Sequence, residues 1–249
     1  MLTARAALPT LAGAVAFLVV WEIVGQAGIL GRSFPALTEI VTAFDEEAAS
    51  SLLMRSLART TTSATVALAI GAVVALLITV VSTLVPPLGR GLDSLASSVY
   101  AIPMIAFGPV LILVAGPETT PIVLGVLSAY FPILVTLSSE LHFAPPVYAD
   151  LSHTLGASRR RAFVRVSFPH AIPAFVDGLR LGAPGAVLGV ILGEWFGAPR
   201  GLGVLILSSL QNFRIPQLWA SALLGVGISF AAYALLTALH RLALRRFAW

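Results

Sequence analysis

The sequence predicts an all-α integral membrane protein with about six transmembrane helices. Of its 249 residues, 58% are hydrophobic and only 10% are charged, and the mean hydropathy is +0.96. Soluble domains carry about 25% charged residues, so this chain has too few charges to cover a globule in water. Several uncharged runs approach or exceed the roughly 18–20 apolar residues that cross a bilayer core. These runs are 8–21, 60–89, 94–117, 119–139 and 181–193.

Apolar length, with Pro, Gly and charge as boundaries, places the predicted spans in order along a single transmembrane domain, residues 1–249. The spans lie near residues 9–30, 60–84, 94–115, 120–141, 178–197 and 218–239. The first apolar stretch is too long for a signal peptide, so we expect it to be retained as a span. Between the first two spans, Thr38 can cap a helix over 39–53 that lies on the membrane surface.

The distribution of arginine predicts the orientation. All 15 basic residues are arginine. With the N-terminus inside the cell, ten of these 15 fall in cytoplasmic segments and five outside, which is the bias that the positive-inside rule describes. We therefore predict a multi-pass protein with both termini in the cytoplasm. The net charge of +4 follows from this topology and does not indicate nucleic-acid binding.

The sequence also excludes several kinds of chemistry for this chain alone. It contains no Gly-x-x-x-x-Gly-Lys-[Ser/Thr] phosphate loop and no lysine, so it cannot hydrolyse ATP by that machinery. It has no cysteine, which removes disulfide and thiol chemistry. The four histidines lie near predicted cytoplasmic span ends or in a loop, not in a converging intramembrane set. We predict no catalytic residue, no metal site and no cofactor of its own.

The predicted cytoplasmic loop 142–177 differs in kind from the other connections. Its residues suit two short helices around a glycine, because Asp150 can cap the first helix and Gly156 can end it in the left-handed conformation. Ser158 can cap the second helix, which Pro169 and a later proline end or kink. The first helix carries two leucines four residues apart, enough to seat in a groove of a partner. The residues alone equally allow a plain basic loop.

The same loop resembles the "EAA" loop of permease subunits of binding-protein-dependent ABC importers. That loop has the form Glu-Ala-Ala, three residues, Gly, nine residues, then a hydrophobic residue, any residue and Leu-Pro. Here Asp150-Leu151-Ser152 stands for Glu-Ala-Ala, Gly156 has the required spacing, and nine residues precede Val166-Ser167-Phe168-Pro169. The two alanines and the leucine before the proline differ from the family pattern. Segments 34–36 and 100–109 are similar to signatures of the nitrate/sulfonate/taurine branch, whereas the turn 114–118 lacks that branch's aromatic residues.

The resemblance implies a MetI-like (type I) ABC importer permease that forms the pathway for a small polar solute, such as a nitrate-, sulfonate- or taurine-like anion. A thiamine- or riboflavin-precursor solute is the alternative, and an ATP-independent secondary transporter is a further one. The implied partners are two ABC ATPase subunits that bind ATP and Mg²⁺, a second permease copy, membrane lipid and an extracytoplasmic substrate-binding protein. The implied location is the bacterial inner membrane. The residues implied to dock the ATPase through the 150–173 loop are Asp150, Leu151, Ser152, His153, Leu155, Gly156, Ala157, Ser158 and Pro169.

A few residues within the spans are candidates for function or for close packing. Glu194 ends the fifth span and could line an outer gate or cap a helix. Pro103 and Pro132 interrupt spans, and we expect them to form kinks beside a pathway. Four glycines recur at small-xxx-small spacing, which indicates close helix packing either at a dimer centre or inside one subunit. They are Gly182, Gly185, Gly189 and Gly193.

Overall fold

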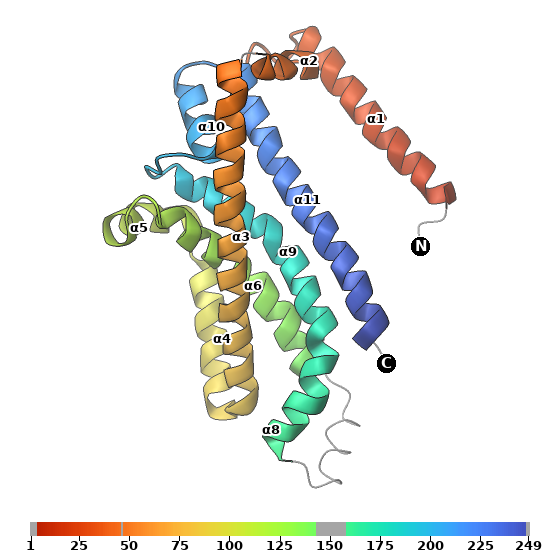
Figure 1. The fold of residues 1–249 in the computed structure, drawn as a ribbon, viewed down its shortest axis with the longest axis vertical. Helices are drawn as coiled ribbons and strands as arrows, with labels where there is room; N and C mark the ends of the chain where they lie inside the picture. Colours follow the sequence, from red (N-terminus) through yellow and green to blue (C-terminus); the bar gives the residue numbers. More distant parts are fainter. Residues whose placement is uncertain (1–3, 46, 143–157, 248–249) are drawn as a thin grey trace.

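The structure is a computed structural model that describes residues 4–45, 47–142 and 158–247 (Figure 1). Every regular element in these ranges is helical. The longer helices are α1 (Ala4–Gln26), α3 (Glu47–Leu84), α4 (Pro86–Ala101), α6 (Thr120–His142), α9 (Phe168–Glu194), α10 (Leu202–Gln211) and α11 (Ile215–Phe247). The short ones are α2 (Leu37–Val41), η1 (Thr42–Phe44), η2 (Met104–Phe107), α5 (Gly108–Ala115), α8 (Arg159–Ala162) and η3 (Phe163–Ser167).

The centre of the protein is the contact between α6 and α9, with α3 packed on α6 and α11 packed on α9. Glycine makes this approach possible. A Cβ atom at position 189 would lie 2.5 Å from the carbonyl oxygen of Leu124, and one at Gly193 would lie 2.4 Å from Cα of Pro121. The other two glycines of the predicted series also face the α6 backbone. The series therefore serves packing inside one subunit, one of the two arrangements that the sequence allows.

The membrane-spanning candidates follow the predicted order. Four described helices are long and apolar enough to cross a bilayer, and five crossings result if a bent pair counts as one. The apolar part of α1, Leu11–Gln26, is shorter. By length and composition the described helices thus supply four or five of the roughly six predicted spans, with α1 as the remaining candidate. The four long spans are Ala49–Leu84, Thr120–Leu141, Arg160–Glu194 and Ile215–Arg246.

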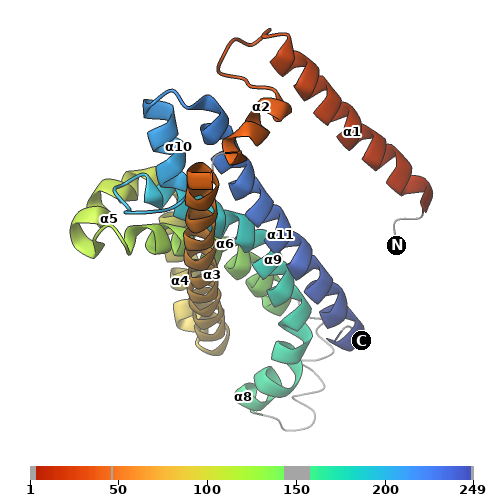
Figure 2. The same cartoon turned by 45° about the horizontal axis from the view of Figure 1, so that its top comes forward.

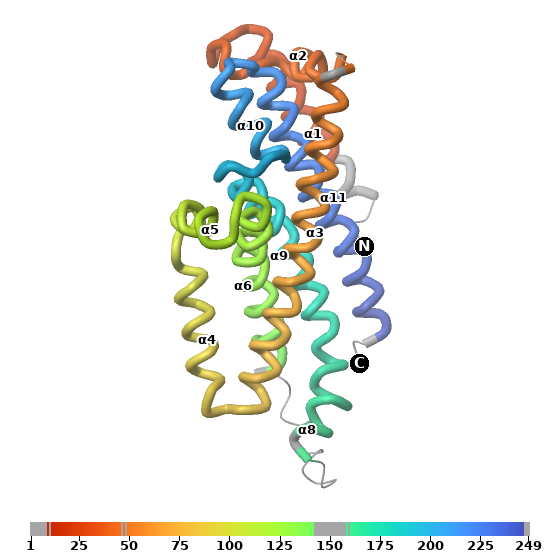
Figure 3. Tube along the Cα trace, turned by 60° about the vertical axis from the view of Figure 1, so that its left-hand side comes forward, coloured from red at the N-terminus to blue at the C-terminus, as the bar shows by residue number. Residues whose placement is uncertain are grey.

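The predicted third span, 94–115, is not one straight helix. Its two parts, Pro86–Ala101 and Met104–Ala115, are bent by 86° at the break. Ile102 is extended there, with φ −73° and ψ 128°, because a proline disfavours the helical conformation in the residue before it. Pro103 therefore separates α4 from η2 and does not kink a continuous helix. In Figure 3, α5 lies across the upper ends of α4 and α6.

The predicted surface helix over 39–53 is also wrong, because α3 begins at Glu47 and runs without a break to Leu84. Thr38 does not cap a helix, since Ala36 holds the N-cap position of α2. The hydroxyl of Thr38 instead donates to Oε1 of Glu22 at 2.7 Å. That hydrogen bond fastens the end of α1 to α2.

α1 stands away from the other long helices and is fastened at its upper end (Figure 2). Trp21 stacks on Phe34 with ring centroids 5.2 Å apart and meets Trp219 of α11 edge-on, also at 5.2 Å. The indole N–H of Trp21 donates to the carbonyl of Pro35 at 3.1 Å. Large aromatic contacts of this kind join α1 to the top of α11.

The fifth span begins well before residue 178, where the sequence predicted it. The helix starts at Arg159, passes through the π turn η3 and continues as α9 to Glu194. Pro169 has no N–H, so it cannot make the normal helical hydrogen bond. Just before it, the N–H of Phe168 donates to the carbonyl of Phe163, the longer bond of a π turn. The helix therefore continues past the prolines, and residues 159–177 of the predicted loop are helical.

Candidate functional site

The predicted docking residues fall mainly outside the part of the chain that the structure describes. Ser158 directly precedes α8, and its carbonyl accepts from the N–H of Ala162 at 3.0 Å, so it holds the predicted position at the helix start. Pro169 lies in the first turn of α9. The docking role of the loop stays a prediction. The residues outside the described ranges are Asp150, Leu151, Ser152, His153, Leu155, Gly156 and Ala157.

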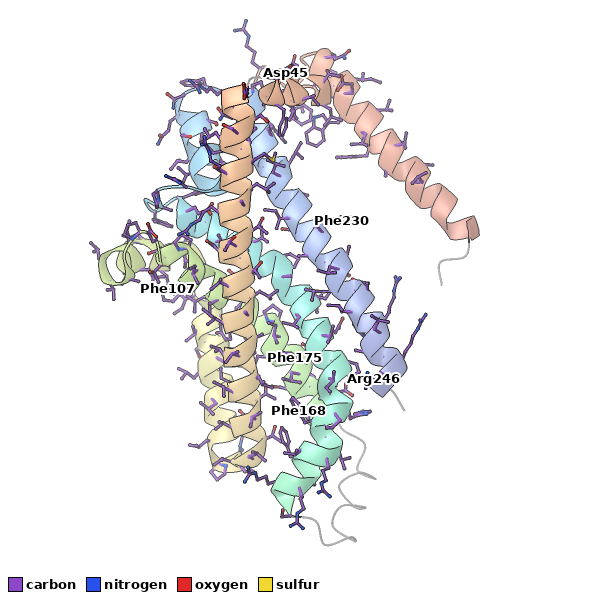
Figure 4. All side chains as sticks on the ribbon, in the orientation of Figure 1. Asp45, Phe107, Phe168, Phe175, Phe230 and Arg246 are labelled. Atoms are coloured by element: carbon purple, nitrogen blue, oxygen red, sulfur yellow. The ribbon has the colours of Figure 1, made fainter. Side chains whose placement is uncertain are left out.

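The helices that flank this segment are described, and both lie toward the same end of the protein. α6 ends at His142, and the helix resumes at Arg159 with α8, which lies at the bottom of Figure 1. α11 runs toward the same end, where Arg246 is labelled in Figure 4. The arginines at 160, 161 and 165 are exposed here. This basic end fits the predicted cytoplasmic side.

A cavity of about 460 Å³ lies between α6, α9 and α11 at this lower end. Nε2 of His170 lies 3.2 Å from Oε1 of Glu140, and Nδ1 of His240 lies 3.1 Å from Oδ1 of Asp177. Arg180 also pairs with Asp177, and its guanidinium lies 5.3 Å from the ring centroid of a tyrosine on α11. The polar residues that line the cavity are Thr136, Ser139, Glu140, His170, Asp177 and His240.

At the other end of α9, Glu194 is 2% exposed and both of its carboxylate oxygens are bonded. The hydroxyl of Thr60 donates to Oε1 at 2.8 Å, and the N–H of Gly203 donates to Oε2 at 2.7 Å. The hydroxyl oxygen of Thr60 in turn accepts a hydrogen bond from the N–H of Leu202 at 2.9 Å. The pair satisfies two free N–H groups at the start of α10 and places a carboxylate at the positive end of that helix.

Two glycines make room for this carboxylate. A Cβ at Gly201 would lie 2.1 Å from Cδ of Glu194, and Gly201 has φ +148°, which only glycine adopts readily. A Cβ at Gly203 would lie 2.3 Å from the carbonyl oxygen of Ile191. Of the two roles predicted for Glu194, the described contacts are those of a helix cap, which joins α3, α9 and α10. A gating role stays a prediction.

The two candidate prolines lie in different settings. Pro103 is exposed at the break between α4 and η2, whereas Pro132 lies inside α6, which continues through it. The hydroxyl of Thr136 donates to the Pro132 carbonyl at 2.9 Å. A Cβ at Gly108 would lie 2.2 Å from the ring of Phe196, so the segment that follows Pro103 packs close to the end of α9 that carries Glu194. A role beside a pathway stays a prediction for both prolines.

Sequence reasoning did not identify Thr60 as a functional residue. In the structure Thr60 is fully buried. The residue stands in the run Thr60-Thr61-Thr62-Ser63, which is typical of close packing between helices in lipid. Nothing local marks it as the partner of a carboxylate far along the chain. It also missed the contact between Glu140 and His170, because near a span end both side chains can be solvated.

Comparison with known proteins identifies the family. The profile of the family "Binding-protein-dependent transport system inner membrane component" matches residues 82–249. The chain is 31% identical over 222 residues to the formylaminopyrimidine transport permease protein ThiX of Halalkalibacterium halodurans, covering 86% of this chain and 87% of that protein. It is 23% identical over 209 residues to the putative aliphatic sulfonates transport permease protein SsuC of Bacillus subtilis, covering 83% and 76%.

The fold has a counterpart among solved structures. A chain of the methionine ABC transporter MetNI in an inward-facing conformation superposes with a TM-score of 0.71. The two chains are 19% identical, and the match covers 80% of this chain and 99% of the other. This likeness confirms the predicted MetI-like fold. Together with the family match, it shows that this chain belongs to the binding-protein-dependent inner-membrane permeases of ABC importers.

Proposed function

We propose that this chain forms the translocation pathway for a small polar solute in an ATP-driven importer. The observation that carries the proposal is the family match over 82–249, which includes both flanks of the predicted docking loop. The free energy comes from a separate ATPase, because this sequence has no phosphate loop and no lysine. A substrate-binding protein delivers the solute on the outer side.

In this proposal the 150–173 loop docks one ATPase subunit, and a second permease copy docks another. The two ATPases hold ATP and Mg²⁺, and their closure moves the docked loops as rigid bodies. The described geometry supports this arrangement because α6 and α8, which flank the loop, both lie toward the same basic end of the protein. Both predicted cytoplasmic termini are expected on that same side.

For the solute, we infer an aminopyrimidine-type heterocycle in place of the nitrate-, sulfonate- or taurine-like anion first predicted. The supporting observation is the higher identity with ThiX than with SsuC over a similar length. The turn 114–118 also lacks the aromatic residues of the anion-importing branch. Uptake into vesicles that contain the assembled importer tests this. Labelled formylaminopyrimidine is expected to accumulate with ATP, and taurine and nitrate are not; accumulation of an anion alone would contradict the inference.

Docking is tested by Gly156→Trp in a complex assembled with its ATPase. A bulky ring in the middle of the docking loop is expected to remove ATPase co-purification and to reduce uptake at least tenfold. Gly91→Trp is the matched control, because a Cβ at that position meets nothing within 4 Å. If the position 156 variant transports as well as the control, the loop does not dock the ATPase.

A further inference from the structure

Two polar contacts join the lower ends of three helices. Glu140 in the last turn of α6 meets His170 in the first turn of α9, with 3.2 Å between Oε1 and Nε2. Asp177 of α9 meets His240 of α11, with 3.1 Å between Oδ1 and Nδ1. Both contacts lie at the end of the bundle where Figure 4 labels Phe168 on α9 and Arg246 on α11. They therefore connect the helices on the side where the docking loop begins and ends.

The Glu140–His170 contact lies beyond the region of close helix packing. A Cβ at Gly178 would lie 2.3 Å from Oγ1 of Thr136 and 2.8 Å from Cα of Ile133, so α6 and α9 are in tight contact at that level. Below it the cavity of about 460 Å³ opens between the same helices and α11. Apolar packing across a cavity of this size is interrupted, and the Glu140–His170 contact bridges α6 and α9 at its edge.

We propose that Glu140 and His170 act as positioning residues, here called the 140–170 clasp, that make α6 and α9 move together when the ATPase moves the loop between them. This inference rests on the proposed function. The clasp closes the segment of chain that contains all the predicted docking residues, since Glu140 precedes Asp150 and His170 follows Pro169. The Asp177–His240 contact extends the connection to α11.

The physical reason is that motion enters these helices at their ends. If the lower ends of α6 and α9 can separate, the cavity between them widens. The displacement of the loop then moves only these ends and is not passed to the rest of the helices. With the clasp closed, the two ends keep their spacing, and the displacement reaches the tight contact at Gly178 and the helices above it. The paired side chains are 43% exposed for Glu140 and 23% exposed for His170. A polar contact this exposed contributes little to folding stability, so its loss should affect coupling while the fold persists.

The absence of cysteine from this chain allows a direct test. The double variant Glu140→Cys with His170→Cys opens the clasp, and a short bifunctional methanethiosulfonate reagent closes it again through reversible disulfides. In the importer assembled with its ATPase and binding protein, the double variant is expected to retain its ATPase. Stimulation of ATP hydrolysis by the loaded binding protein is expected to fall about fivefold or more, in the range of typical coupling effects. Cross-linking should restore most of the stimulation, and dithiothreitol should remove it again.

Two controls separate coupling from other effects. Each single cysteine variant treated with the reagent should stay unstimulated, because one thiol cannot close the clasp. The pair Arg59→Cys with Glu118→Cys replaces another exposed contact, 3.5 Å long and far from the docking loop, and should stay stimulated throughout. Normal stimulation in the open double variant, or no recovery on cross-linking, overturns the clasp. Failure of the unaltered chain to co-purify with any ATPase overturns the proposed function itself.

Discussion

Gly189→Ala is expected to force α6 and α9 apart and to destabilise the protein by about 2 kcal/mol or more, as overpacking of a tight interior does. The added methyl would lie 2.5 Å from the carbonyl oxygen of Leu124 and 2.3 Å from Oγ of Ser128. A backbone oxygen cannot turn away as the end of a flexible side chain can. The change is measured as the unfolding transition of the purified protein in detergent.

Gly227→Ala is the matched control on α11, where a new Cβ meets nothing within 4 Å. Alanine favours a helix over glycine by about 1 kcal/mol, so this control should be neutral or slightly stabilising. Only the change at position 189 is therefore expected to destabilise the protein. Equal effects would mean that helix propensity, and not the approach of α6, determines the result at position 189.

Thr60→Val is expected to weaken the attachment of α10 and to lower stability by about 1–3 kcal/mol, the cost of leaving buried polar groups without partners. Valine keeps the shape of threonine but can neither donate to Glu194 nor accept from the N–H of Leu202. Unfolding in detergent measures the loss. Limited proteolysis near α10 should also become faster, because its first turn loses a cap.

Thr61→Val is the control for this second change. Its hydroxyl donates to the carbonyl of Leu57 within α3 and the residue is exposed, so the effect should stay within about 0.5 kcal/mol. Combining Thr60→Val with Glu194→Gln should cost less than the sum of the two single changes, because both residues belong to one network. Strict additivity would show that Thr60 and Glu194 act independently.

The sequence predicted the helical class, the order of the spans and the tight packing of the fifth one, because these depend on apolar length and on residue size. The glycine series on α9 is an example: small-xxx-small spacing predicts close approach to another helix. The spacing does not predict which helix approaches these glycines, since α6 and a second subunit offer the same kind of surface. Only the position of Leu124 and Pro121 against those glycines decides it.

Local rules failed where a long-range contact competes with them. Thr38 has the chemistry of an N-cap, but its hydroxyl donates a hydrogen bond to Glu22 instead. Pro169 has the chemistry of a helix breaker, but it directly follows a π turn and the helix continues. Glu194 was identified from its charge at membrane depth. Its partner Thr60 lies 134 positions earlier in the sequence, and only the folded structure brings the two together.

The unbroken α3 has 38 residues, which at 1.5 Å each is about 57 Å of helix. A hydrocarbon core is about 30 Å thick, and even a tilt of about 40° shortens the vertical rise of such a helix only to about 44 Å. Part of α3 must therefore extend beyond the hydrocarbon core. Its first turns pack against η1 and α10, so any extension at that end carries these short helices to the level of the headgroups.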